Sequence, residues 1–365
     1  MQSRDCGMAA FAGYYWSAAS GSRTCLRRHV KVCERLVACA PRVARRSISD
    51  TVGKASRRTH GGTRFVVPRA TTSEAGTDVP PSGSGDYMAE RRLALGAAIA
   101  CEILGFGIPL LAAIADASAS GQDGNTLMHL LQTKYSTHFA MMLLLNGFAV
   151  IHSGLAALRP RVAQLVGERI YRVIFALCSL PAAGYVIAFY IAHRYDGMQL
   201  WTIQGVPGVH DAVYVLTFVS FLFLYPATFN LLEVAAVQKP GFRIYETGIT
   251  RITRHPQLWG QLMWCVAHCA WTGTTLPLVA SAGLLAHHFL GAWHGDVRLQ
   301  NTYKQAWEQY AVRTSLLPFA AVVRGDQTIQ WREFVRPAYI GVIAFTLGAY
   351  AAHPAMLRLI GELHL

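Results

Sequence analysis

A cysteine and a histidine one helical turn apart are the residues of this sequence best suited to chemistry. Cys265 and His268 lie in a short apolar stretch with Gln261 and Thr272, at the i, i+4, i+7, i+11 spacing that places side chains on one face of a helix. A thiolate and an imidazole on one face can approach the same metal, and imidazole, with or without thiolate, is the usual protein ligand of haem iron. The spacing therefore predicts a ligand-bearing helix face.

A second imidazole has to come from another helix. His152 is the best-placed candidate, because Ser153 and Gly154 beside it leave room for a flat macrocycle. Each histidine taken alone is more often a packing residue, and the alternative for Cys265 is a small buried side chain, so the prediction of a metal site rests on the cluster. An ionisable group within a membrane costs about 2.5 to 3.5 kcal/mol and is a functional candidate by default. Further candidates, with roles that the sequence leaves open, are Glu102, His193, His255, His287, His288 and His294.

Two other kinds of metal site fit the sequence less well. A structural zinc site needs four tetrahedral ligands, and Cys265, His268 and Cys269 have no second pair at finger-like spacing. The histidines between residues 287 and 294 are similar to the histidine boxes of membrane di-iron desaturases, but the further boxes that such a site needs are absent from the sequence.

The elements that must position these residues are apolar helices. A helix needs about 20 mostly apolar residues to cross the hydrocarbon core, and the long stretches here are apolar nearly all round, unlike the helices of a soluble bundle. The short stretch Leu258–Trp271 is expected to be a half-helix or a broken partner of the next span. The sequence predicts an all-α, polytopic membrane bundle of six to seven transmembrane helices, with spans at Leu93–Ala115, Phe139–Leu158, Val173–Ala192, Ala212–Leu232, Leu276–Trp293 and Tyr339–Leu357.

The positive charge of the chain is concentrated at its beginning. Residues 1–70 contain 14 basic and three acidic side chains, which leaves 19 basic and 17 acidic side chains in the rest, so the charge does not indicate a nucleic-acid-binding face. An Arg-, Ser- and Ala-rich leader that is poor in acids is typical of an organelle transit peptide, with a disordered basic tail as the alternative. We expect a chloroplast transit peptide at 1–70, a disordered linker at 71–90 and a membrane domain at 91–365.

The four cysteines after residue 70 and the charges of the loops do not indicate a further function. Cys101, Cys178, Cys265 and Cys269 all lie in apolar stretches, so a disulfide framework is not expected. Lys and Arg occur in the loops on both sides of any alternating topology, so the positive-inside rule does not settle the orientation from the sequence.

The region around the candidate ligands resembles a known family. Residues 248–257 (GITRITRHPQ), continued by 260–261 (GQ) and 263–268 (MWCVAH), are similar to the signature of the 15-cis-zeta-carotene isomerases, which belong to the wider NnrU-type membrane proteins. Residues 286–296 (AHHFLGAWHGD) and 152–154 (HSG) support the resemblance, which extends from about Glu90 to the C-terminus.

The resemblance implies a cofactor, an activity and a location. Haem b would be bound within the membrane, with its iron held by His152 and His268 and with Cys265 as an alternative ligand when the iron changes redox state. Cys265 and His268 would be the catalytic residues of a cis–trans isomerase that converts 9,15,9'-tri-cis-zeta-carotene to 9,9'-di-cis-zeta-carotene. The implied partners are zeta-carotene from the bilayer, the membrane of the plastid and other carotenoid desaturation enzymes, with no nucleic acid.

Two other functions stay open at this point. A non-catalytic membrane haem protein that transfers electrons or senses redox state would use the same ligands. The 254–256 turn (RHP) and the segment Tyr303–Pro318 are also similar to membrane methyltransferases of the isoprenylcysteine type and to sterol reductases. Gly295-Asp296 stands where the methyltransferases carry paired glutamates, which counts against that function. The turn could instead be a helix cap that binds no cofactor.

Overall fold

The described part of the chain is built from helices. The computed structural model describes residues 85–120, 124–224, 246–335 and 337–362, and within these ranges it contains no strand. A single bridge pairs Gln199 with Thr274. The expected transit peptide at 1–70 and most of the expected linker lie outside the described residues.

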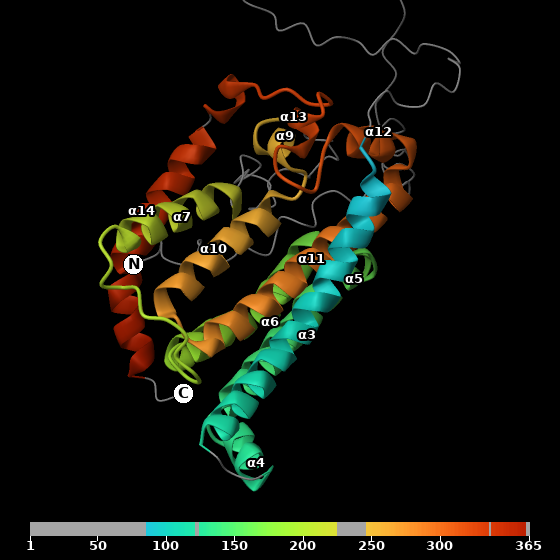
Figure 1. Ribbon diagram of the computed structural model, residues 1–365. Coiled ribbons are helices and arrows are strands. Elements are labelled where there is room, and N and C mark those ends of the chain that lie inside the picture. Colours follow the sequence, from blue (N-terminus) through green and yellow to red (C-terminus); the bar gives the residue numbers. More distant parts are fainter. Residues whose placement is uncertain (1–84, 121–123, 225–245, 336, 363–365) are drawn as a thin grey trace, which may run out of the picture. The chain divides into compact units, whose positions relative to one another are not determined.

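Five helices are long and apolar enough to cross a membrane (Figure 1). They are α3 (Tyr87–Ala119), α5 (Ser136–Val166), α6 (Glu168–His193), α11 (Thr275–Tyr303) and α14 (Pro337–Gly361). The apolar helix α7 (Val209–Leu224) is shorter, and the rest of the span expected there, up to residue 232, lies outside the described residues. The prediction of an all-α, multi-pass membrane bundle is confirmed.

The helix that carries the cysteine and histidine pair, α10 (Pro256–Thr272), runs beside α7 in the opposite direction. The ring of Trp271 lies 5.6 Å from the ring of His210 at the start of α7. A Cβ at Gly260 would come within 2.7 Å of the backbone at Ser220 and Leu224, so only glycine permits this approach. The short helix thus packs along α7. Five of the described helices are long and apolar enough to cross a membrane, so the expected number of six to seven spans stays a prediction.

A tight turn joins α10 to α11. Gly273 has a φ of 71°, in the left-handed region that glycine adopts without strain. The loop after α6 packs on this turn, where Leu200 N donates to Gly273 O at 2.7 Å. The two helices then lie against each other, with Leu258 near Phe289 and Trp293. The short helix is therefore a partner of the next span, one of the two arrangements expected for it.

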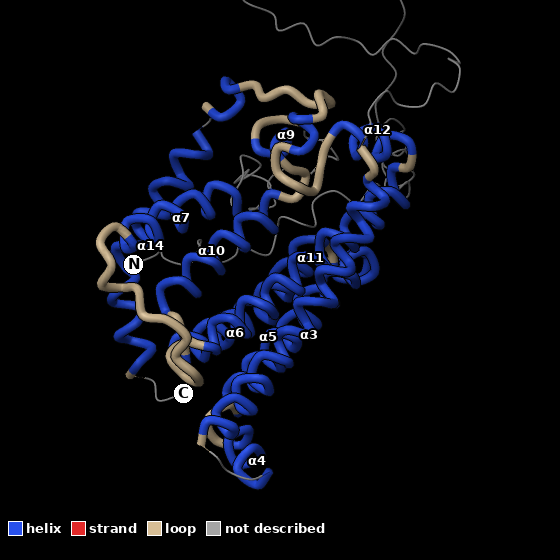
Figure 2. The backbone as a smooth tube through the Cα atoms, viewed as in Figure 1, coloured by secondary structure: helices blue, strands red, loops and turns tan. Residues whose placement is uncertain are grey.

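Contacts with α11 fix the directions of its neighbours, which lie alongside it (Figure 2). His138 and Thr275, at the starts of α5 and α11, lie 2.9 Å apart, so these two helices run parallel. Arg91, near the start of α3, donates to Gln300 near the end of α11 at 2.6 Å, so α3 runs antiparallel to α11.

The first helix begins earlier than the hydropathy of the sequence indicates. Asp86 caps α3 by accepting from Ala89 N at 2.9 Å, and the helix starts at Tyr87, within the range expected to be a linker. Glu90 consequently lies in the first turn of α3. The remaining helices are short: α4 (Gly124–Gln132), α9 (Ile249–Ile252), α12 (Gln305–Arg313), α13 (Ala320–Val323) and the 3-10 helix η2 (Trp331–Phe334).

Candidate functional site

The imidazole of His268 is oriented by the turn of α10 that precedes it. Its ring stacks on Trp264 with 3.7 Å between centroids, and Nδ1 lies 2.9 Å from the Trp264 carbonyl oxygen. Because a carbonyl can only accept, Nδ1 carries the proton and Nε2 keeps its lone pair. A metal-ligating histidine usually donates its other ring N–H to a carbonyl or carboxylate in this way. The chemistry of His268 therefore fits a residue that would bind a metal through Nε2.

His152 is held by a serine and surrounded by aromatic rings. Its Nδ1 lies 2.8 Å from Oγ of Ser179, a residue of α6 that is only 2% exposed. The rings of Phe148 and Phe175 each lie 5.2 Å from the imidazole, and that of His287 lies 5.9 Å away. No described residue bonds to Nε2 of His152, which leaves this nitrogen available as a ligand.

The two predicted histidine ligands have separate neighbours. His152 packs against His287, whereas Cys269, the residue after His268, places its Sγ 3.1 Å from Oγ of Ser281. Six residues of α11 separate His287 from Ser281, or about 9 Å of helix rise. No hydrogen bond or ring contact joins His152 to His268 in the described ranges. Each imidazole thus presents its free Nε2 from its own helix.

The predicted stripe on α10 divides into two contacts. Gln261 Nε2 lies 3.5 Å from Sγ of Cys265, a residue that is 2% exposed. Thr272 Oγ1 donates to the carbonyl of His268 at 2.7 Å. Among the described residues, no hydrogen bond joins the thiol of Cys265 to the imidazole of His268. The four side chains lie on one face of the helix, but the thiol of Cys265 and the imidazole of His268 have different hydrogen-bond partners.

Helix α11 brings two further imidazoles to His152. His288 is buried, and its ring lies 6.0 Å from that of His287. Sequence reasoning noticed both residues but had no signal that would pair them with His152, which is more than 130 positions away. Among the described residues, no group of three or more His, Cys, Asp or Glu side chains could hold a metal ion, so the zinc and di-iron alternatives gain no support.

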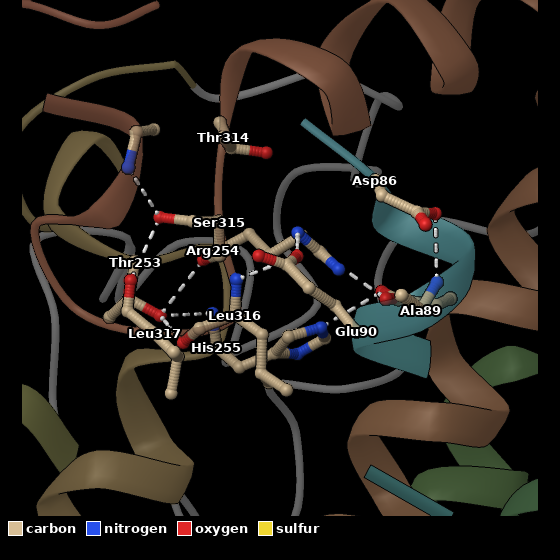
Figure 3. Close-up of polar contacts among 12 residues, drawn as sticks. Asp86, Ala89, Glu90, Thr253, Arg254, His255, Thr314, Ser315, Leu316 and Leu317 are labelled. Atoms are coloured by element: carbon tan, nitrogen blue, oxygen red, sulfur yellow. Dashed lines mark hydrogen bonds and ion pairs between the residues drawn. The ribbon is translucent and has the colours of Figure 1, made fainter. Parts of the chain in front are cut away.

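A second polar group, the Arg254 cluster, consists of Glu90, Arg254, His255 and Asp296. Figure 3 labels the first three of these residues. Arg254 Nη1 donates to Glu90 Oε2 at 2.6 Å, and its Nε donates to Asp296 Oδ2 at 3.2 Å. His255 Nε2 lies 2.9 Å from Asp296 Oδ1. Burial alone would lower the pKa of Arg254, but the carboxylates of Asp296 and Glu90 raise it above its ordinary value. The cluster joins α3, α11 and the start of α10.

The same cluster holds a segment that follows α12 (Figure 3). Glu90 Oε2 also accepts from Leu316 N at 3.0 Å, and Arg254 N donates to Ser315 O at 2.9 Å. Thr253 Oγ1 donates to Leu316 O at 2.7 Å. His255 is the N-cap residue of α10, but its side chain makes no capping hydrogen bond. The 254–256 turn therefore tethers four segments and does not act as a side-chain cap.

Comparison with known proteins places this arrangement in a family. The family model described as NnrU protein matches residues 140–359, which include His152, Cys265 and His268. The chain belongs to the NnrU family. The resemblance to NnrU-type membrane proteins is thereby confirmed. No solved structure matches the chain.

Two curated relatives are similar to this member of the NnrU family. Both are named 15-cis-zeta-carotene isomerase, chloroplastic: that of Arabidopsis thaliana is 54% identical over 232 residues, and that of Zea mays is 50% identical over 237 residues. The matches cover 63% and 64% of this chain and 63% and 65% of the relatives, so the matched part of the chain spans less than two thirds of the length of either relative. Both relatives are named chloroplastic, and five described helices are long and apolar enough to cross a bilayer. The chain is therefore a multi-pass chloroplast membrane protein.

Proposed function

We propose that this protein is a cis–trans isomerase that converts 9,15,9'-tri-cis-zeta-carotene to 9,9'-di-cis-zeta-carotene with haem b as its cofactor. The observation that carries the activity is the identity of 50% and 54% to two proteins named 15-cis-zeta-carotene isomerase. The cofactor is supported by the candidate ligands, because His268 keeps a free Nε2 while its Nδ1 donates to a backbone carbonyl.

The reaction makes limited demands on the protein. Rotation about one double bond changes no atoms and no net redox state, so neither a hydride carrier nor an acid and base pair is required. When bound, haem iron would supply electron density to the polyene or polarise it and so weaken one π bond, while the protein supplies binding and orientation. The chain therefore has to hold the iron, exclude water and align a long apolar substrate.

Three residues of the chain are proposed to hold the iron. His268 and His152 would hold the iron through Nε2, each oriented by the hydrogen bond of its Nδ1. Cys265 would be an alternative ligand, and its Sγ accepts a hydrogen bond from Gln261. A shell of Phe148 and Phe175 keeps the surroundings of His152 apolar.

The substrate would reach the site sideways from the bilayer. Zeta-carotene is an apolar chain, and the spans of this protein expose many large apolar side chains along their length. The partners that follow from this route are the lipid phase and the other carotenoid desaturation enzymes that make and use zeta-carotene there.

Expression in a carotenoid-producing bacterium that accumulates the 15-cis isomer tests the proposal. The chain without residues 1–70 should convert the tri-cis pool to the 9,9'-di-cis form, as followed by chromatography, and the purified protein should show a Soret band. A tri-cis pool left untouched by folded, haem-loaded protein would favour the electron-transfer function. Folded protein without a Soret band would remove both haem functions and favour the methyltransferase.

A further inference from the structure

The helix bundle has two ends, to which the labelled helices and turns can be assigned (Figure 1), and the sequence places different numbers of basic residues at each. One end is called the basic end here. It is formed by the start of α3, the α5–α6 turn, α9, the end of α11, α12, α13 and η2. Of the Lys and Arg residues in the described ranges, the basic end carries 13 and the opposite end, with α4 and the α10–α11 turn, carries Lys134, Arg194 and Arg358. The 13 are Arg91, Arg92, Arg159, Arg161, Arg169, Arg172, Arg251, Arg254, Arg298, Lys304, Arg313, Arg324 and Arg332.

Ion pairs neutralise only part of this charge. Carboxylates at the basic end bind several of the arginines, as Glu168 does with Arg159 and Arg172, and Glu333 does with Arg251. Five exposed cations at this end form no ion pair with a described residue: Arg92, Arg161, Arg169, Lys304 and Arg332. They leave a surplus of positive charge on the surface of the basic end.

Large apolar side chains are exposed at the same end. Val323 and Val335 are each 85% exposed, and Trp331 is 75% exposed, although none of them lies in a helix that crosses the bundle. Phe319 is 46% exposed and has a φ of 63°, a strained conformation for a residue other than glycine. Tryptophan beside basic residues is typical of the interface between membrane and water.

We propose that the basic end lies in the headgroup layer of a leaflet rich in anionic lipids, on the side of the membrane from which the chain is inserted. The apolar side chains between residues 317 and 335 enter the boundary between headgroups and acyl chains, and the five unpaired cations contact the anionic headgroups. Short loops rich in Lys and Arg stay on the side of insertion, and the count of 13 against three decides which side that is. The sequence alone did not show which loops share an end.

Lipid retention tests the headgroup contact. The full chain is placed in nanodiscs that contain phosphatidylglycerol and phosphatidylcholine in equal amounts, and the lipids that it retains are measured by native mass spectrometry. The combined variant Arg161→Gln, Arg169→Gln and Arg332→Gln should lose anionic lipid enrichment by about fivefold for each cation that contacts a headgroup. Arg358→Gln, at the opposite end, is the control that should retain the enrichment. Equal enrichment in the wild type and the combined variant would overturn the proposal.

Labelling with a membrane-impermeant maleimide tests the orientation with single substitutions that need no stable triple variant. In inverted vesicles from an expressing bacterium, where the side of insertion faces outward, Arg332→Cys should gain a label relative to the parent chain and Arg358→Cys should gain none. Intact spheroplasts should give the reverse pattern. Labelling of Arg358→Cys in the inverted vesicles, with Arg332→Cys protected, would place the basic end on the wrong side and refute the proposal.

Discussion

The Arg254 cluster and the imidazoles within the bundle show two ways of burying polar groups in a membrane protein. In the cluster, each charged group faces an opposite charge, since Arg254 contacts both Glu90 and Asp296. The imidazoles of His152 and His268 instead use one nitrogen each for a hydrogen bond and leave the other free. A fully paired cluster of this kind holds helices together, whereas an imidazole with one free nitrogen is suited to the ligand role proposed for His152 and His268.

The largest expected effect is on stability, from breaking the Arg254 cluster. Arg254→Ala leaves the carboxylates of Glu90 and Asp296 buried without their partner, which typically costs 3 to 5 kcal/mol. We expect a much lower melting temperature for the purified protein. Arg92→Ala, on the same end but exposed and unpaired, is the matched control and should change stability by less than about 0.5 kcal/mol. A melting temperature unchanged in Arg254→Ala would show that the cluster has no structural role.

On the other side of the comparison, the free imidazoles should govern cofactor binding and not folding. His268→Ala and His152→Ala are each expected to abolish haem retention while the helical circular dichroism spectrum is kept, because each removes a strong ligand from one side of the iron. His210→Ala, an exposed histidine, is the control. Full occupancy with an unchanged absorbance spectrum in either variant would refute that assignment.

Ser179 should act through His152. Ser179→Ala removes the hydrogen bond to Nδ1, and loss of such an orienting partner typically lowers metal affinity or activity 10- to 100-fold. The haem dissociation rate, measured by transfer to a scavenger protein, should rise, and Ser179→Thr should restore it. If the alanine variant releases haem at the wild-type rate, the serine does not position the imidazole.

Cys265 should affect the redox state and not the retention of haem. A thiolate favours ferric iron through its negative charge, so Cys265→Ala should keep haem but alter the ferric spectrum. Turnover should be faster under dithionite than under ferricyanide. Cys269→Ala, one turn along the same helix, is the control. A ferric spectrum identical to that of the wild type would make Cys265 a packing residue, and equal turnover in both states would rule out redox gating.

The smallest effect concerns a surface ion pair. Burial alone would raise the pKa of Glu246, but hydrogen bonds from Arg313 and Gln327 lower it below its ordinary value of 4.5. A lowered pKa stabilises the folded state above the ordinary pKa, and this stability is lost as the pH falls through the folded pKa. Glu246→Gln should therefore cost about 0.2 to 1 kcal/mol at pH 7 and nothing in acid. A difference in thermal stability that grows on acidification would contradict this.

The sequence predicted what depends on local pattern. Hydropathy located the spans, because length and apolar content are properties of a continuous stretch, and the spacing on α10 correctly placed Cys265 and His268 on a single helix. The haem itself and its ligands stay predictions. Spacing assigns a face to a side chain but not its partner, which is why the separate contacts of Cys265 and His268 were not foreseen.

Contacts between distant residues escaped sequence reasoning. The sequence places Glu90 in the expected linker, because hydropathy does not show the Asp86 cap that extends α3. In the structure, Glu90 accepts a hydrogen bond from Arg254, 164 positions away. The contact between His287 and His152 also depends on tertiary packing. Helices α5 and α11 run parallel, which places the two rings at the same height along the pair of helices. An arginine and a carboxylate without local partners are the signal that could have suggested the first contact.

The close packing at Gly260 also bears on how the chain is assembled during synthesis. A helix of 17 residues that carries two glutamines and a histidine partitions poorly into lipid by itself. Helix α7, which packs at Gly260, leaves the ribosome before α10, whereas α11, which packs in the cluster of Leu258, leaves it afterwards. The packing of α10 is therefore complete only when α11 has followed it into the membrane. The predicted ligand helix is thus positioned late, and we expect cofactor loading to wait for the synthesis of α11.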